Sequence, residues 1–281
     1  MRQMHASGPV RVIAVTGGKG GVGKTNISIN LGVTMARQGK NVLLLDADLG
    51  LANVDVLLGL HPRKNLSHVM SGECELEEII VTAPGGLKIV PGASGMQAMA
   101  DLSSVERGGL VNAFSELNTD LDVMLIDTAA GISESVLNFT RAAQEVIIVV
   151  CDEPASMTDA YAMIKTLRCE YGVNRFRVIT NMVAGAAEGQ ALYKKLTAVT
   201  NRFLDVTLDF MGAIPYDEYL RKAIQKQKPL VEAYPRSKAS MAFKNLAQKV
   251  DKWPVPTEAQ GHLEFFWERL IGDQYAQGAQ S

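Results

Sequence analysis

The stretch VRVIAVTGGKGGVGKTNISINLGVTMARQG, residues 10–39, decides the fold of this chain. It opens with a run of β-branched and small apolar residues (10–15), which is typical of a buried strand. Glycines follow, and then a segment whose apolar residues recur at helical spacing until Gly39, a residue type that commonly ends helices. The order strand, glycine-rich loop, helix is the start of an α/β unit. The helical face consists of Ile27, Leu31, Thr34 and Met35.

Further apolar runs alternate with helical patterns along the rest of the chain. Most of these runs are apolar on both faces, as in strands that helices cover on both sides. We therefore predict an α/β fold with a doubly wound, mostly parallel sheet, formed by one domain over residues 10–252. The six further runs are 41–46, 87–92, 122–127, 145–150, 176–181 and 208–215.

Composition excludes several classes of protein. The 281 residues are 47% hydrophobic and carry a formal net charge of -2, which argues against a disordered chain and against a uniformly basic nucleic-acid binder. The three cysteines are too scattered for a disulfide framework, so a reducing compartment fits. The N-terminal residues lack a signal-peptide core, and no apolar run reaches the ~20 residues of a spanning helix. We expect a cytoplasmic protein.

Charge is distributed unevenly along the chain. Residues 71–122 hold nine acidic and two basic residues, whereas residues 217–252 hold nine basic and four acidic ones. These segments are either the solvated faces of helices or patches that guide the docking of a partner.

The glycine-rich loop GKGGVGKT, residues 18–25, fits the phosphate-binding pattern GxxxxGK[ST]. Its glycines let backbone N–H groups approach phosphates, and the helix N-terminus adds its positive dipole end. Lys24 can reach the β- and γ-phosphates, and Thr25 can offer its hydroxyl to Mg²⁺. We assign to the nucleotide site Gly18, Lys19, Gly20, Gly21, Val22, Gly23, Lys24, Thr25 and Asn26.

A second lysine, Lys19, lies inside this loop and gives the sequence KGGVGKT. This sequence resembles the deviant Walker A motif of the MinD/ParA (SIMIBI class) ATPases. The resemblance implies an ATPase that binds ATP or ADP with Mg²⁺ and forms an ATP-dependent homodimer. It also implies that Lys19 reaches the nucleotide of the partner subunit, where a cation acts on the developing γ-phosphate charge.

Two apolar strands end in aspartates and match the switch regions of these ATPases. In DADLGLANVDVLLG (46–59), the resemblance makes Asp48 the residue that orients the attacking water, with Asn53 near the phosphates and Asp46 supporting Mg²⁺. In VMLIDTAAGI (123–132), Asp127 would hold Mg²⁺ through water, and Gly131 would sense the γ-phosphate. The expected metal set is Thr25, Asp48 and Asp127.

Four further residues match more weakly, and each also fits a turn or capping residue. By resemblance, Glu153 contacts the ribose across the dimer and Asn181 binds the adenine. Pro215 and Asp217 match the loop that closes over the base.

Narrower features resemble one branch, the flagellar-number regulators of the FlhG or FleN type. They are DADLGLANVDVLLGL (46–60) and GAIPYDEYLRKAIQKQKPLVEAYPRS (212–237). This branch antagonises the AAA+ enhancer-binding activator of flagellar genes and works alongside the SRP-like flagellar GTPase FlhF. The first nine residues lack a DQAxxLR-like motif, so direct activation of that GTPase is not expected.

Two other functions compete with this interpretation. A MinD-like division-site ATPase would carry a basic amphipathic tail. A ParA-like partition ATPase would bind DNA, for which the basic segment 217–252 is the one supporting feature. We expect no direct binding to nucleic acid.

Residues 257–274 form a predicted amphipathic helical tail. Its apolar residues recur at i, i+3, i+4, i+7 and i+8, while residues 258–273 hold four acidic residues and one basic residue. Acidic charge disfavours anionic lipid, so we favour docking on the protein's own body or on a partner chain over reversible contact with the inner membrane or cell pole. The apolar face consists of Leu263, Phe266, Trp267, Leu270 and Ile271.

Overall fold

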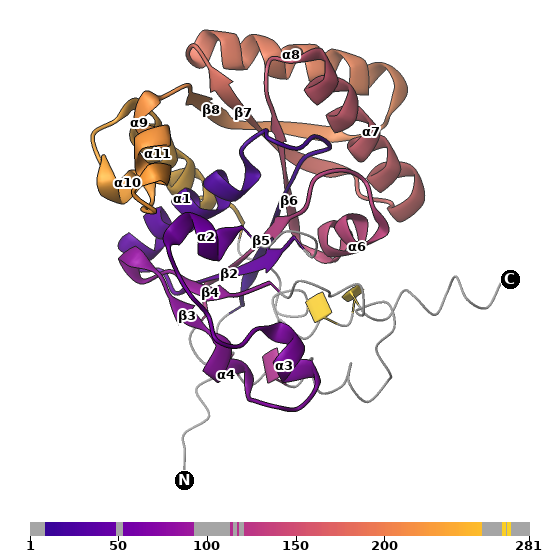
Figure 1. Ribbon diagram of the computed structural model, residues 1–281. Coiled ribbons are helices and arrows are strands. Elements are labelled where there is room, and N and C mark those ends of the chain that lie inside the picture. The colour runs from indigo at the N-terminus through magenta and orange to yellow at the C-terminus, as the bar shows by residue number, and fades with distance from the viewer. Residues whose placement is uncertain are drawn as a thin grey trace, which may run out of the picture.

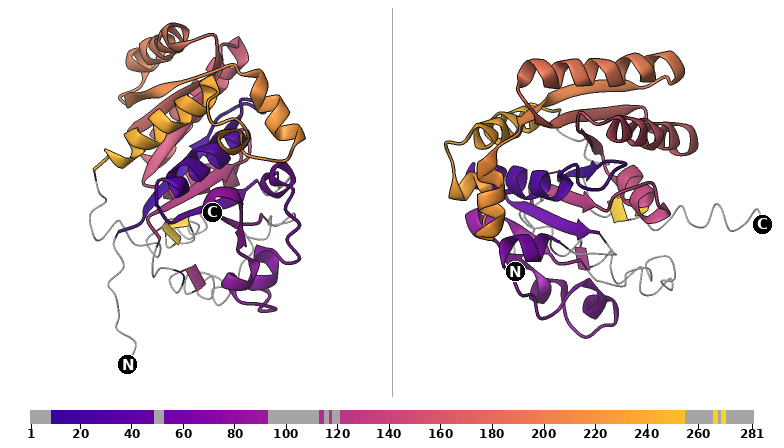
Figure 2. Two further views of the ribbon diagram at one scale, coloured as in Figure 1. Left: turned by 90° about the vertical axis from the view of Figure 1, so that its left-hand side faces the viewer. Right: turned by 45° about the horizontal axis from the view of Figure 1, so that its top comes forward.

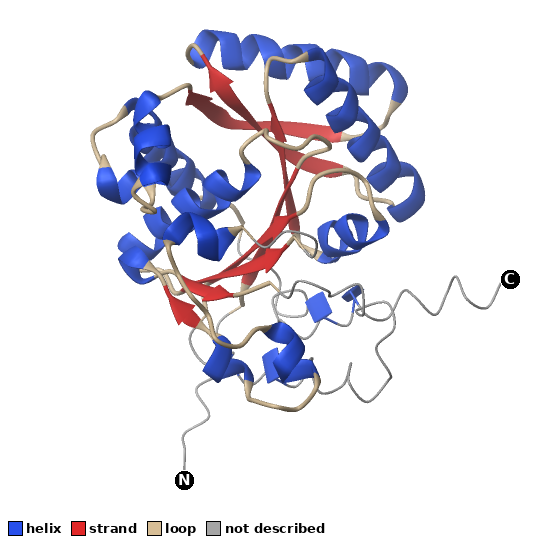
Figure 3. Cartoon of the chain, viewed as in Figure 1, coloured by secondary structure: helices blue, strands red, loops and turns tan. Residues whose placement is uncertain are grey.

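A twisted, mostly parallel β-sheet runs through the middle of the protein, with helices on both of its faces (Figure 1, Figure 3). The structure is a computed structural model, and it describes residues 9–48, 53–92, 113–114, 117, 121–254, 266–267 and 269–270. Within these residues, no helix combines the length and the apolar character that crossing a bilayer requires.

The described strands form one eight-stranded sheet, and its pairing is parallel except at one edge, where β3 and β4 run antiparallel. Buried β-branched and leucine side chains dominate the central strands, as expected for strands that are covered on both faces. In spatial order the strands are β3 (Val81–Thr82), β4 (Lys88–Val90), β2 (Val42–Ala47), β5 (Val123–Thr128), β1 (Arg11–Thr16), β6 (Glu145–Val150), β7 (Arg175–Val183) and β8 (Thr207–Pro215).

Alternation along each strand divides the core into two faces. In β1, Ile13 and Val15 pack with the helices of one face, whereas Val12 and Ala14 pack on the other. The helices of the first face lie together on one side of the sheet (Figure 1, Figure 2). They are α1 (Lys24–Arg37), α2 (Val54–Leu58), α9 (Glu218–Gln225), α10 (Leu230–Ala233) and α11 (Lys238–Asp251).

The second face is covered by helices from the middle of the chain. Over β6 and β7 they bury side chains such as Met163, Leu167 and Leu192. Over β2 and β5 they bury Leu66 and Leu76. These helices are α3 (Leu66–Met70), α4 (Leu76–Ile79), α6 (Glu134–Ala142), α7 (Pro154–Tyr171) and α8 (Ala186–Phe203).

The strand order places a switch point beside β1. From β1 the chain crosses to β2 on one side, while β6, β7 and β8 follow on the other. Ligands of doubly wound sheets bind at the carboxyl ends of the strands near such a point. The expected α/β fold is confirmed, and each predicted strand exists within two residues of its expected start. The antiparallel edge strand β3 was not predicted, because two residues leave no periodic signal.

Four residues of the predicted tail are described, and three of them are buried. Phe266, Trp267 and Leu270 pack on the second face of the sheet, and the Trp267 ring centroid lies 4.1 Å from that of Phe114. Next to them, Arg269 donates from Nη2 to the carbonyl oxygen of Arg141 at 2.6 Å. These contacts support docking of the tail on the body. Leu263, Ile271 and the tail's predicted bounds lie outside the described residues.

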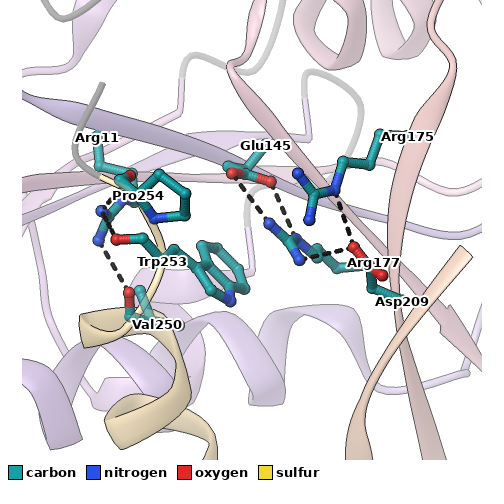
Figure 4. A network of polar contacts seen from close by, with 8 residues as sticks. All are labelled: Arg11, Glu145, Arg175, Arg177, Asp209, Val250, Trp253 and Pro254. Carbon is teal, nitrogen blue, oxygen red and sulfur yellow. Dashed lines mark hydrogen bonds and ion pairs between the residues drawn. The ribbon is translucent and has the colours of Figure 1, made fainter. Parts of the chain in front are cut away.

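A buried arginine joins the amino ends of three strands (Figure 4). Arg177 donates to both carboxylate oxygens of Glu145, at 3.1 and 3.3 Å, and to Asp209 Oδ2 at 2.8 Å. Its guanidinium carbon also lies 4.5 Å from the centre of the Trp253 ring. Nearby, Arg11 donates to the backbone oxygens of Trp253 and Pro254, so the end of α11 is fixed to the sheet.

We expect Arg177→Ala to lower the free energy of unfolding by about 2–4 kcal/mol, because it leaves Glu145 half-buried without its bidentate partner. Arg175→Ala is the matched control. Arg175 pairs with the same Asp209, but its side chain is 52% exposed against 7% for Arg177, so a loss below about 1 kcal/mol is expected. Urea denaturation measures both variants, and equal losses would contradict this account.

Candidate functional site

The glycine-rich loop lies between β1 and α1, at the carboxyl end of the sheet. Gly23 precedes α1 with a φ of +93°, and the first turn of the helix has neither a side-chain cap nor an acidic residue. Gly18 has no room for a side chain, since an added Cβ would lie 2.4 Å from the Asp159 carbonyl oxygen. Around Gly21, by contrast, an added Cβ would meet nothing within 4 Å. The loop therefore offers an open, uncapped helix N-terminus, as anion binding requires.

Lys24 lies under this loop in a mostly buried position. Its Nζ donates to the carbonyl oxygen of Lys19 at 3.3 Å. Burial lowers the pKa of the Lys24 amine, and the negative charges of Asp127 and Asp48 oppose that shift. A buried cation in contact with the loop is suited to meet phosphate oxygens there.

Asp127 is the penultimate residue of β5 and is buried beside the first turns of α1. Burial raises the pKa of Asp127 to about 7, hydrogen bonds from Thr25 and Ser28 oppose this shift, and the charge of Asp46 adds to it. Ser28 Oγ donates to Asp127 Oδ1 at 2.9 Å. The sequence analysis assigned no role to Ser28. Its signal is the position one helical turn after Lys24 and Thr25, on the same face of α1.

Asp46 stands opposite Asp127 in the sheet, because the two residues are register partners of β2 and β5. Burial raises the pKa of Asp46 to about 6. Its Oδ1 accepts from the Asp48 N–H at 3.2 Å, and its Oδ2 accepts from the N–H groups of Asn53 and Val54 at 3.1 and 3.2 Å. Asp46 thus holds the backbone at two places, at Asp48 directly after β2 and at the start of α2.

Asn181 lies directly beside the phosphate loop. Its Nδ2 donates to the Val22 carbonyl oxygen at 2.8 Å, and a Cβ added to Gly23 would lie 2.4 Å from that same nitrogen. The next residue, Met182, has a φ of +57° and is exposed, a backbone conformation that non-glycine residues rarely adopt. The strained end of β7 therefore borders the nucleotide site. The sequence gives no local signal for this conformation.

Glu153 and Lys19 come together within one chain. Glu153 precedes α7, and its carboxylate forms an ion pair with the Lys19 amine, which raises the pKa of Lys19. Gly131 has a φ of +92° and open space where a side chain would be. Asp127 and Gly131 thus lie at the same end of the sheet as the glycine-rich loop that contains Lys19.

Asp217 has a local structural role. Its Oδ1 accepts from the Tyr219 N–H and caps α9, and its Oδ2 accepts from the Ala239 N–H at the start of α11, each at 3.0 Å. Pro215 ends β8. Both carboxylate oxygens of Asp217 therefore accept hydrogen bonds from the protein backbone. Its predicted role in closing over a base would depend on its position in the loop, because its carboxylate is already engaged.

The site as a whole fits Mg²⁺ and a nucleotide. An uncapped helix N-terminus and a buried lysine suit phosphate. Thr25 and Asp127 offer the hydroxyl and carboxylate oxygens that Mg²⁺ prefers. Two buried carboxylates near one buried amine also leave negative charge that a divalent cation would offset.

Known proteins match this chain over nearly its whole length. A family model described as "ParA: NUBPL iron-transfer P-loop NTPase" matches residues 9–251. This chain belongs to the ParA/MinD family of P-loop NTPases. The expected ATPase family is confirmed by this match and by the relatives below.

Two curated members of the ParA/MinD family carry flagellar names. The Antiactivator FleN of Pseudomonas aeruginosa is 60% identical over 271 residues, which cover 96% of this chain and 97% of that protein. The flagellum site-determining protein YlxH of Helicobacter pylori is 35% identical, with 94% and 90% covered.

Among solved structures, a family member with a bound nucleotide is similar. It is the septum site-determining protein MinD of Pyrococcus horikoshii complexed with Mg-ADP. Its TM-score is 0.69 at 28% identity, and the match covers 86% of this chain and 96% of that one.

The raised pKa of Asp127 predicts that Asp127→Asn stabilises the nucleotide-free protein. The usual aspartate value is 3.8 and the folded value about 7, so the fold favours the neutral form and loses stability as pH rises between them. In EDTA at pH 8 we expect a gain of about 1–3 kcal/mol, since an uncharged amide can still accept from Ser28.

At pH 5 the gain should shrink toward zero, because Asp127 is then already protonated in the fold. Thermal unfolding at both pH values measures the difference. Asp122→Asn, an exposed carboxylate near the other end of β5, is the control. Destabilisation of Asp127→Asn at pH 8 would contradict the assigned burial.

Proposed function

We propose that this chain is a dimerising regulatory ATPase that controls flagellar number by antagonising the master transcriptional activator of flagellar genes. The observation that carries the proposal is its 60% identity, over 96% of the chain, with a protein named Antiactivator FleN. A second relative, at 35% identity, is named for determining the flagellum site. The phosphate loop and its buried lysine give the chemistry that such a switch needs.

We assign the nucleotide contacts as follows. The N–H groups of residues 18–26 and the Lys24 amine bind the phosphates, and Thr25 and Asp127 hold Mg²⁺, the latter through water. Bound Mg·ATP would supply the phosphoryl group that is transferred to water. Asp48 orients that water, with Asn53 beside the phosphates. Asn181 is the adenine contact, aided by the loop of Pro215 and Asp217.

Dimerisation would use residues that are paired within one chain here. For Lys19 to reach the nucleotide of a second subunit, its ion pair with Glu153 has to open. Both side chains are substantially exposed, so this costs little. Glu153 then becomes available for the ribose of the second subunit. Loss of the γ-phosphate would release Asp48 and Gly131 and separate the dimer.

Partners and location follow from the same proposal. The activator is an AAA+ enhancer-binding protein, and the flagellar GTPase FlhF remains a further candidate partner. Burial of Phe266, Trp267 and Leu270 against the sheet supports a docked tail. Contact with the inner membrane or the cell pole would first require these side chains to leave their site. We take the cytoplasm as the location.

Deletion of the gene tests the flagellar role. Cells without this protein should carry more flagella, because the activator is no longer restrained, and electron microscopy of cells counts them. A plasmid copy should restore the normal number, and a Lys24→Ala copy should fail to do so. Minicells with a normal number of flagella would instead support the division-site alternative.

Asp48→Ala should trap an ATP-bound dimer, because the nucleotide still binds but water is no longer oriented for attack. Size-exclusion chromatography with light scattering, with Mg·ATP, should give a stable dimer for this variant. Wild type should return to monomer as ATP is consumed. A variant that binds ATP yet elutes as monomer alone would contradict the mechanism.

A further inference from the structure

Lysines and tyrosines form a preorganised cationic surface on α9 and α10. These two helices lie beside α1, the helix of the phosphate loop (Figure 1). The Lys222 amine lies 4.9 Å from the Tyr219 ring centre, and the Lys226 amine lies 5.1 Å from that of Tyr234. The two rings lie 4.7 Å apart. Such contacts hold lysine heads that would otherwise move freely.

A hollow continues this cationic surface. Its volume is about 510 Å³, and it is lined by Lys226, Lys228, Glu232 and Ala233. We call Tyr219, Lys222, Lys226, Lys228, Glu232 and Tyr234 the α9–α10 surface.

The charges of this surface favour a protein segment over a nucleic acid. The lysines attract acidic groups, but Glu232 lies among them in the hollow. A phosphate backbone is uniformly anionic, so that carboxylate would weaken its attraction to the lysines and find no positive group on it. An acidic peptide segment can place its carboxylates on the lysines and a backbone or side-chain donor on Glu232. Electrostatic complementarity therefore points to an acidic segment of a protein.

The α9–α10 surface is tied to both sides of the nucleotide site. On one side, α10 is fixed to the phosphate-loop helix α1: Asn30 Oδ1 accepts from the Val231 N–H, and Arg37 donates to the Val231 carbonyl oxygen, each at 3.1 Å. On the other side lies Gln227, between Lys226 and Lys228. Its Nε2 donates to the Val56 carbonyl oxygen in α2 at 3.0 Å.

Gln227 holds this link in an unusual conformation. Its φ is +51°, and its side chain lies over Gly59, where an added Cβ would come within 3.1 Å of Oε1. A non-glycine residue in the left-handed region is a cost that persists only when its surroundings fix it. The start of α2 is in turn held by Asp46, through the N–H groups of Asn53 and Val54. A shift of Asp46 would thus be passed to α2, Gln227 and the flanking lysines together.

We propose that the α9–α10 surface docks an acidic segment of the partner protein, and that Gln227 makes its lysines follow the nucleotide-dependent position of α2. The inference rests on the proposed function for the identity of the partner. It adds the binding surface and the link by which the nucleotide site controls it.

The test measures the affinity of the full-length chain for the purified flagellar transcriptional activator, in Mg·ADP and in a Mg·ATP analogue. The double variant Lys226→Glu/Lys228→Glu should lose about tenfold or more in affinity. Lys165→Glu/Lys194→Glu, an equal charge reversal at exposed positions of α7 and α8, should stay within about twofold of wild type.

Gln227→Gly tests the link, since glycine keeps the left-handed backbone and removes the side chain. Wild type should bind the activator differently in the two nucleotide states, by about fivefold or more. In Gln227→Gly this ratio should fall to within about twofold, with nucleotide affinity unchanged.

Each contrary result is distinguishable. Failure of wild type to bind the activator in either state would remove the proposed function and this inference with it. Normal binding by Lys226→Glu/Lys228→Glu would overturn the surface and leave the proposed function standing. A Gln227→Gly variant that keeps the full nucleotide ratio would overturn the link. Mixed-sequence duplex DNA that binds wild type, and fails to bind the charge-reversal variant, would assign the surface to nucleic acid instead.

Discussion

Two buried carboxylates, side by side at the ends of β2 and β5, govern this structure. Asp46 and Asp127 are register partners, and their pKa values are raised by burial to about 6 and about 7. The buried amine of Lys24 offsets part of the charge of Asp127. Such an arrangement is costly in a protein interior unless a cation completes it. A bound cation would therefore stabilise the site, so its occupied and empty states differ in free energy.

The two carboxylates have different tasks because their surroundings differ. Asp127 faces the hydroxyl groups of α1 and belongs to the phosphate side of the site. Both carboxylate oxygens of Asp46 accept hydrogen bonds from backbone N–H groups, those of Asp48, Asn53 and Val54. The backbone at Asp48 and at the start of α2 is thereby attached to a carboxylate that lies beside Asp127. From there α2 and Gln227 lead to α9 and α10, so a local charge change has a contiguous route to a surface.

The sequence predicted features that depend on residues close together in the chain. The strand from 10 to 15, the phosphate loop and the helix behind it carry their own periodicity and glycines, and all lie where expected. Features that depend on distant residues were out of reach. In the sequence, Arg177 has no feature that distinguishes it from other polar residues of a strand, because its partners Glu145 and Trp253 come from other elements. Asp46 was expected to support Mg²⁺, and its contacts with the loop needed the folded backbone.

We propose that the nucleotide state moves residues 46–48 and, through α2, the α9–α10 surface. Hydrogen exchange followed by mass spectrometry, on the full chain in Mg·ADP and in a Mg·ATP analogue, tests it most directly. We expect exchange to change together in residues 46–59 and 217–234, while α8 stays the same in both states. A change confined to 46–59, with 217–234 unaffected, would contradict the claim.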